Sequence, residues 1–149
     1  MPTTYSEAYD TITNRLLADW PTVAADIVGI GADAPELRFT GVEVGAIPQT
    51  YFARFTMRSV LERQATLRNG EDQRYTSSGV IFVQVFAPKS DQQAAERLRR
   101  LAEAAKGIFR GKTFDGCIWF RNMRINDLDP EEKFLRANVV GEYEYDEIG

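Results

Sequence analysis

Residues 79–87 read Gly-Val-Ile-Phe-Val-Gln-Val-Phe-Ala, and this stretch decides the fold that the sequence predicts. It is apolar at nearly every position, a pattern typical of a central strand that is covered on both faces. Residues 51–61 alternate instead, with Arg54 and Arg58 on one side and mostly apolar residues on the other. The polar segment from Arg68 to Arg74 lies between them and contains an Asn-Gly turn signal. Together these stretches predict a long β-hairpin with a mobile tip.

Two amphipathic helices are predicted from apolar spacing and capping residues. The first covers residues 4–19 and ends before Pro21, because the residue that precedes a proline is pushed out of the helical conformation. The second covers residues 90–109, with Ser90 as its N-cap and Gly111 as its stop.

Two further strands are predicted at residues 117–125 and 134–146, joined by an acidic turn at 126–132. Residues 29–48 are dense in glycine and proline and predict short strands or an extended arm. The resulting order predicts an α+β fold, in which a mostly antiparallel β-sheet carries two α-helices on one face and a long β-hairpin. A length of 149 residues fits a single domain that spans residues 1–149.

The residue types that are missing exclude several kinds of chemistry. The chain contains no histidine, which removes the commonest general base and the commonest metal ligand. Its single cysteine, Cys117, lies in an apolar run and is interpreted as a small buried side chain rather than a nucleophile. We therefore predict that the chain is not an enzyme and that it binds no cofactor.

The charge balance favours contacts with other proteins. A net charge of −4 argues against bulk attraction to nucleic acid or to acidic membranes. Of the 18 basic residues 14 are arginine, which makes bidentate contacts with carboxylates and stacks on aromatic rings; codon bias is the alternative explanation. No signal peptide or membrane span is evident, so we expect synthesis in the cytoplasm and no membrane partner.

The layout of these elements resembles the tail terminator family of long-tailed bacteriophages, including relatives carried in bacterial prophages. The resemblance rests on the helix that ends at Trp20, the arginine-bearing strand at 51–61, the glycine-initiated strand at 79–88, the helix from Ser90 and the terminal strand at 138–145. It covers nearly the whole chain, most securely residues 75–110 and 134–146. Many relatives are glycine-rich between the central strand and the second helix, where this chain has Lys89, Ser90 and Asp91.

The resemblance implies a structural role without cofactor or catalysis. Family members assemble as a hexameric ring on the end of a completed tail tube, stop tube polymerisation and present a joining surface to the head. The implied partners are other copies of the chain, the major tail tube protein and the head-completion connector (stopper) protein. DNA would pass through the lumen without specific binding. The implied location is the neck end of the tail in the virion, after assembly in the cytoplasm of the host bacterium.

The candidate interface residues are arginines and aromatic residues, the types that most often anchor protein interfaces. They are Arg54, Arg58, Arg68, Arg74, Arg97, Arg100, Tyr143 and Tyr145. The strand face with Arg54 and Arg58, and the hairpin tip, could engage neighbours or simply be solvated. Arg97 and Arg100 are predicted on the outer half of the second helix. The acid–aromatic alternation at 142–147 could pair with a neighbour's sheet edge or merely prevent aggregation.

Rival interpretations stay open at this point. Another neck or tail completion (connector) protein would share the assembly role. A small divalent-cation- or ligand-binding enzyme domain is supported by the acidic turn, whose carboxylates suit hard cations, although the glycine and distal glutamate of a calcium loop are missing. A solvated turn is the favoured interpretation of that segment. A nucleic-acid binder is opposed by the net charge.

Overall fold

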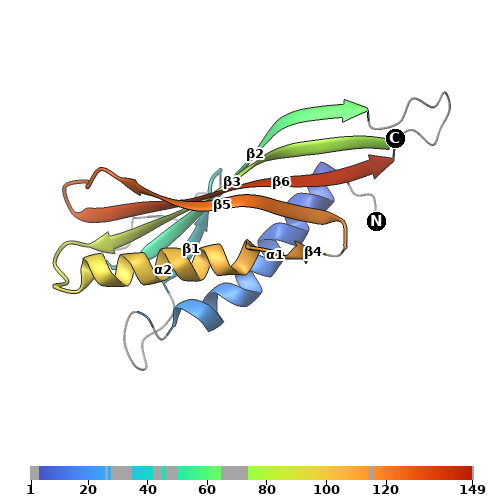
Figure 1. Cartoon of the computed structure of the whole chain (residues 1–149). Coiled ribbons are helices and arrows are strands. Elements are labelled where there is room, and N and C mark those ends of the chain that lie inside the picture. Colours follow the sequence, from blue (N-terminus) through green and yellow to red (C-terminus); the bar gives the residue numbers. More distant parts are fainter. Residues whose placement is uncertain are drawn as a thin grey trace.

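The structure, a computed structural model, describes residues 4–25, 27, 35–41, 45, 50–64, 74–114 and 116–148. Its elements are α1 (Tyr5–Ala24), β1 (Glu36–Phe39), β2 (Phe52–Gln64), β3 (Arg74–Pro88), α2 (Ala94–Phe109), β4 (Thr113–Phe114), β5 (Ile118–Leu128) and β6 (Phe134–Ile148). One sheet has the strand order β1-β2-β3-β6-β5-β4 (Figure 1). The pair β1–β2 is parallel and the other neighbouring pairs are antiparallel. The predicted α+β fold is confirmed.

Both helices lie on the same face of the sheet. Apolar residues of α1, such as Leu16, and of α2, such as Leu101, are buried in one cluster with Phe55, Val83 and Val139 from the strands. Because side chains alternate along a strand, this cluster takes every second residue of β2, β3 and β6. The other residues of these strands point to the opposite side, which we call the open face.

The hairpin of β2 and β3 is longer than the sequence predicts. The strands pair from Phe52–Phe86 out to Gln64–Tyr75, with a register shift that leaves Val60 as a bulged residue. The predicted tip, with Arg68, lies outside the described residues. The prediction that β3 is covered on both faces is wrong, because both helices share one side and leave Val80, Phe82 and Gln84 half-buried on the other.

Helix α1 continues past Pro21 to Ala24, so the predicted end at Trp20 is wrong. A proline inside a helix removes one backbone hydrogen bond, and tertiary packing offsets that cost here. Trp20 and Ala24 are both buried in the core, and the Trp20 indole nitrogen donates a hydrogen bond to the Pro35 carbonyl at 2.8 Å. At the other end, Thr4 caps the helix, since its hydroxyl accepts from the backbone amide of Glu7 at 3.2 Å.

Helix α2 begins at Ala94, four residues later than its predicted start, and Ser90 does not cap it. Residues 89–93 form turns that are held by Asp91, as described below. The two-residue strand β4 was not predicted. Strand β6 lies between β3 and β5 rather than at an edge, so neither alternative for residues 142–147, pairing with a neighbour's sheet edge or protecting an edge from aggregation, applies. Among the described residues, no helix combines the length and apolarity that crossing a bilayer needs.

Candidate interaction surface

The open face is a regular lattice of side chains set by the strand registers. One row across β2, β3, β6 and β5 contains Arg58, Val80, Glu142 and Arg121. The next row contains Thr56, Phe82, Val140 and Arg124. A sheet face that only meets water usually carries polar residues on every strand. Here Val80 and Phe82 of β3 and Val140 of β6 form an apolar strip beside Glu142, and arginines of β2 and β5 flank it.

Arg54 and Arg58 lie on β2 with their guanidinium groups over aromatic rings. Arg54 lies 5.8 Å from the centre of the Phe86 ring, and Arg58 lies 5.8 Å from the centre of the Phe82 ring. Stacking holds a guanidinium flat and leaves its N–H donors directed outward. Neither side chain makes a hydrogen bond or ion pair within the described part of the chain. Both can therefore donate hydrogen bonds to a carboxylate of another molecule.

The other arginine side chains of the open face that the structure describes are already engaged. Arg121 forms an ion pair with Glu144, and Arg124 donates to the Asn122 carbonyl at 3.0 Å. Arg136 donates to the Asp129 carbonyl at 2.8 and 3.0 Å and lies 3.2 Å from a Glu131 oxygen. Among the described side chains of this face, Arg54 and Arg58 are therefore the arginines that remain available to bind another molecule.

The bulge in β2 adds an apolar feature at one end of the hairpin. Val60 is 68% exposed and Leu61 is 53% exposed, which makes them the most exposed large apolar side chains of the described residues. In Figure 1, β2, β3 and β6 run on past the helices at this end of the sheet. The helices therefore do not cover this part of the hairpin. We call Val60 and Leu61 the knob.

Three phenylalanines close the other end of the open face. The Phe52 and Phe86 rings stack at 4.2 Å, and Phe134 meets Phe52 edge-on at 5.3 Å. All three are buried in a small cluster of their own, separate from the main core. They stabilise this end of the sheet without help from a helix, which leaves the middle of the open face and the knob as the accessible part.

The predicted candidates on α2 and β6 do not join this surface. Tyr143 and Tyr145 are 1% and 2% exposed, because their parity turns them toward the helices, so their predicted interface role within a folded subunit is corrected to core packing. Arg100 is exposed on α2, on the opposite side of the sheet from Arg54. The side chain of Arg74, like Arg68 as a whole, lies outside the described residues.

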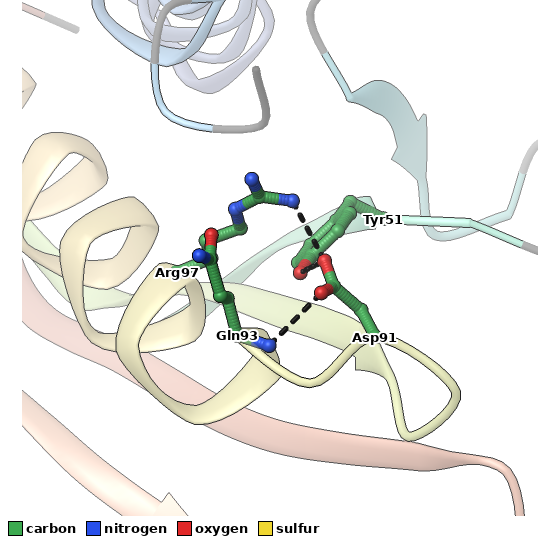
Figure 2. Close-up of polar contacts among 4 residues, drawn as sticks. All are labelled: Tyr51, Asp91, Gln93 and Arg97. Atoms are coloured by element: carbon green, nitrogen blue, oxygen red, sulfur yellow. Dashed lines mark hydrogen bonds and ion pairs between the residues drawn. The ribbon is translucent and has the colours of Figure 1, made fainter.

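Arg97 points inward, contrary to its predicted outward position, and belongs to a polar cluster at the start of α2. Figure 2 shows Tyr51, Gln93 and Arg97 converging on the Asp91 carboxylate. The Tyr51 hydroxyl donates to the carboxylate at 2.5 Å, the Arg97 guanidinium at 2.7 Å and the backbone amide of Gln93 at 2.9 Å. Sequence reasoning missed this cluster because Tyr51 is 40 residues away from Asp91.

The electrostatics of this cluster indicate a structural clamp. Burial, together with the hydrogen bond to Asp91, raises the pKa of Tyr51 to about 12. The same hydrogen bond from Tyr51, with one from the Gln93 amide, lowers the pKa of the Asp91 carboxyl. The phenol therefore stays protonated and the carboxylate stays ionised at neutral pH. The hydrogen bonds that Tyr51, Gln93 and Arg97 make to Asp91 satisfy these polar groups and tie the start of α2 to the start of β2.

The acidic turn contains no assembled metal site. Asp127, Asp129 and Glu132 are exposed, and Glu131 is paired with Arg136. Among the described residues, no group of three acidic or cysteine side chains is placed to hold a metal ion.

The comparisons with known proteins bear on the fold. No family model and no curated protein sequence matches the chain. The chain is similar to a solved protein structure whose name states no function, with a TM-score of 0.57 and 12% sequence identity. The match covers 89% of this chain and 94% of that one. At this identity the likeness concerns the arrangement of helices and strands alone.

Proposed function

We propose that this chain is a structural tail protein of the tail terminator kind, which caps a completed phage tail tube as a hexameric ring. In this role it stops tube polymerisation and provides the surface on which the head connector docks. The observation that carries the proposal is the open face, with the exposed knob and the guanidinium groups of Arg54 and Arg58, which make no hydrogen bond or ion pair among the described residues. The layout of elements along the sequence supports the same role.

A closed ring needs two unlike surfaces on each subunit, because neighbours meet head to tail. The open face and the helix layer are unlike in this way, since they lie on opposite sides of one sheet. Arginine and exposed apolar groups are the usual anchors of such contacts. The long hairpin adds reach, because its end is not covered by the helices (Figure 1).

The proposal is tested by tube capping. The tail tube protein encoded with this chain is polymerised with and without the purified chain, and tube lengths are measured by negative-stain electron microscopy. We expect shorter tubes with a ring at one end. A connector protein of another kind would bind a preformed terminator ring and leave the tube lengths unchanged.

Matched variants make the test specific to the open face. Replacing Arg54 and Arg58 with alanine removes the two uncommitted cations and should abolish capping. Replacing Lys89 and Lys133, two exposed lysines that lie in neither the helices nor the strands, with alanine makes the same change in charge outside the two proposed ring surfaces and should leave capping intact. An unchanged tube-length distribution with the wild-type chain rejects the proposed function.

A further inference from the structure

A groove runs between the C-terminal halves of α1 and α2, on the side of the molecule away from the open face. Val23 and Ile108 contribute apolar surface, Ala104 and Gly107 keep the wall of α2 low, and Lys112 lies at the end of the groove. Its volume is about 500 Å³, enough to hold several side-chain groups. Val23 is 38% exposed, so the apolar surface in the groove is accessible.

No packing contact that the structure describes around position 107 requires a glycine there. It lies in the last turns of α2, and a Cβ atom added there would meet nothing within 4 Å. A glycine inside a helix costs up to about 1 kcal/mol relative to alanine. A glycine at this position lets another chain approach α2 closely, because a side chain here would fill the groove.

The knob of β2 is the matching feature on the same chain. Val60 and Leu61 form a compact apolar projection, in which the bulge leaves Val60 without a cross-strand partner and Leu61 lies opposite Ser78. Figure 1 places the end of β2 away from the parts of α1 and α2 that form the groove, so the knob does not reach the groove of its own subunit. When a projection and a groove lie at different places on one chain, the projection of one copy can fit the groove of the next, which is a head-to-tail contact.

Charge beside the two features is complementary. Glu62 follows the knob and is exposed, and Lys112 is exposed at the end of the groove. Neither side chain has an ion-pair partner among the residues that the structure places. An acidic group next to the knob would therefore meet a basic group next to the groove.

From these observations we propose that the knob of one copy, Val60 and Leu61, docks in the α1–α2 groove of the next copy. This inference rests on the proposed function, because it names the contact by which subunits of the ring recognise each other. The contact buries the two most exposed apolar side chains and the accessible surface of Val23, which is favourable in proportion to the apolar area removed from water.

Thiol cross-linking tests the contact directly. Leu61→Cys protein is mixed with tagged Thr22→Cys protein, whose cysteine lies in the groove and leaves Gly107 unchanged, and a short bis-maleimide is added. Both positions are exposed, so neither change disturbs the core. The control pair is Leu17→Cys with Thr22→Cys, because Leu17 is 50% exposed on α1 and does not line the groove. The wild-type chain controls for Cys117, which is buried.

We expect the Leu61 pair to form linked heterodimers at least about tenfold faster than the Leu17 pair, because docking raises the effective concentration of the two thiols. Equal rates for the two pairs overturn the inference. The double variant Leu61→Cys/Thr22→Cys separates the inference from the proposed ring. Linked species that close at a hexamer support both. Linked chains that never close at six support the contact and reject the hexameric ring, whereas a native hexamer without specific linking does the reverse.

Discussion

At the residue scale, Gly79 is required by the packing of β3 against β2 and β6. A Cβ atom at this position would lie 2.0 Å from the Arg58 carbonyl oxygen and 2.5 Å from the Tyr143 hydroxyl. The first neighbour is backbone and cannot move aside. We expect Gly79→Ala to lower the free energy of unfolding by about 1–3 kcal/mol or more, measured by urea denaturation.

Gly107→Ala is the matched control for that measurement, because its Cβ would meet nothing within 4 Å. Replacing a helical glycine with alanine should leave stability unchanged or raise it by up to about 1 kcal/mol. A Gly79→Ala protein that unfolds at the wild-type urea concentration would contradict the described packing of Tyr143.

Gly141 provides a second prediction of a different kind. Here the added Cβ would lie 1.9 Å from the Met123 sulfur, which a bulge in β5 brings over the glycine. The bulge is marked by Asn122, whose φ of 55° lies in the left-handed region. Because a methionine side chain can be shortened, Met123→Ala should relieve part of the damage caused by Gly141→Ala.

A double-mutant cycle measured by urea denaturation tests this pair. We expect a coupling free energy of about 0.5–3 kcal/mol between the two changes, in the direction of rescue. Strictly additive effects would show that Met123 does not occupy the space above Gly141.

At the element scale, the clamp at the start of α2 predicts a pH dependence. The pKa of Tyr51 is raised from 10.0 to about 12, so the folded state favours the protonated phenol. Its contribution to stability is fully present below pH 10 and is lost as the pH rises toward 12. Tyr51→Phe removes the hydrogen bond to Asp91, at a cost of about 1 kcal/mol at neutral pH.

Urea denaturation between pH 10 and 12 checks the sign of this effect. The stability of Tyr51→Phe should fall less steeply with pH than that of the wild type. A residual alkaline loss should remain, because burial also raises the pKa of Tyr143. Identical pH slopes for the two proteins would mean that Tyr51 does not donate to Asp91 in solution.

The elements themselves were largely predictable, and their ends were not. Period-two alternation at 51–61 and 134–146 identified β2 and β6, because one face of each packs on the helices. The end of α1 was missed, since burial of Ala24 outweighs the local effect of Pro21. The start of α2 was missed because Asp91, rather than Ser90, accepts the backbone amide of Gln93, and Asp91 is itself held by Tyr51, which is distant in sequence.

At the scale of the whole molecule, strand order decides which predicted interface residues are available. Alternation placed Arg54 and Arg58 opposite the core, and the structure leaves them on the open face. The same alternation could not show that β6 lies between β3 and β5, which turns Tyr143 and Tyr145 into core residues. The groove between α1 and α2 is formed by two helix segments that lie about 80 residues apart in the sequence. No local pattern of residues therefore predicts it.

The central claim, that copies of this chain assemble through the open face and the knob, is tested most directly by native mass spectrometry over a series of protein concentrations. We expect the wild-type chain to pass from monomer to hexamer as its concentration rises, and Arg54→Glu/Arg58→Glu to remain monomeric because both cationic anchors are reversed. A wild-type chain that stays monomeric at every concentration, including in the presence of tail tubes, would contradict the account.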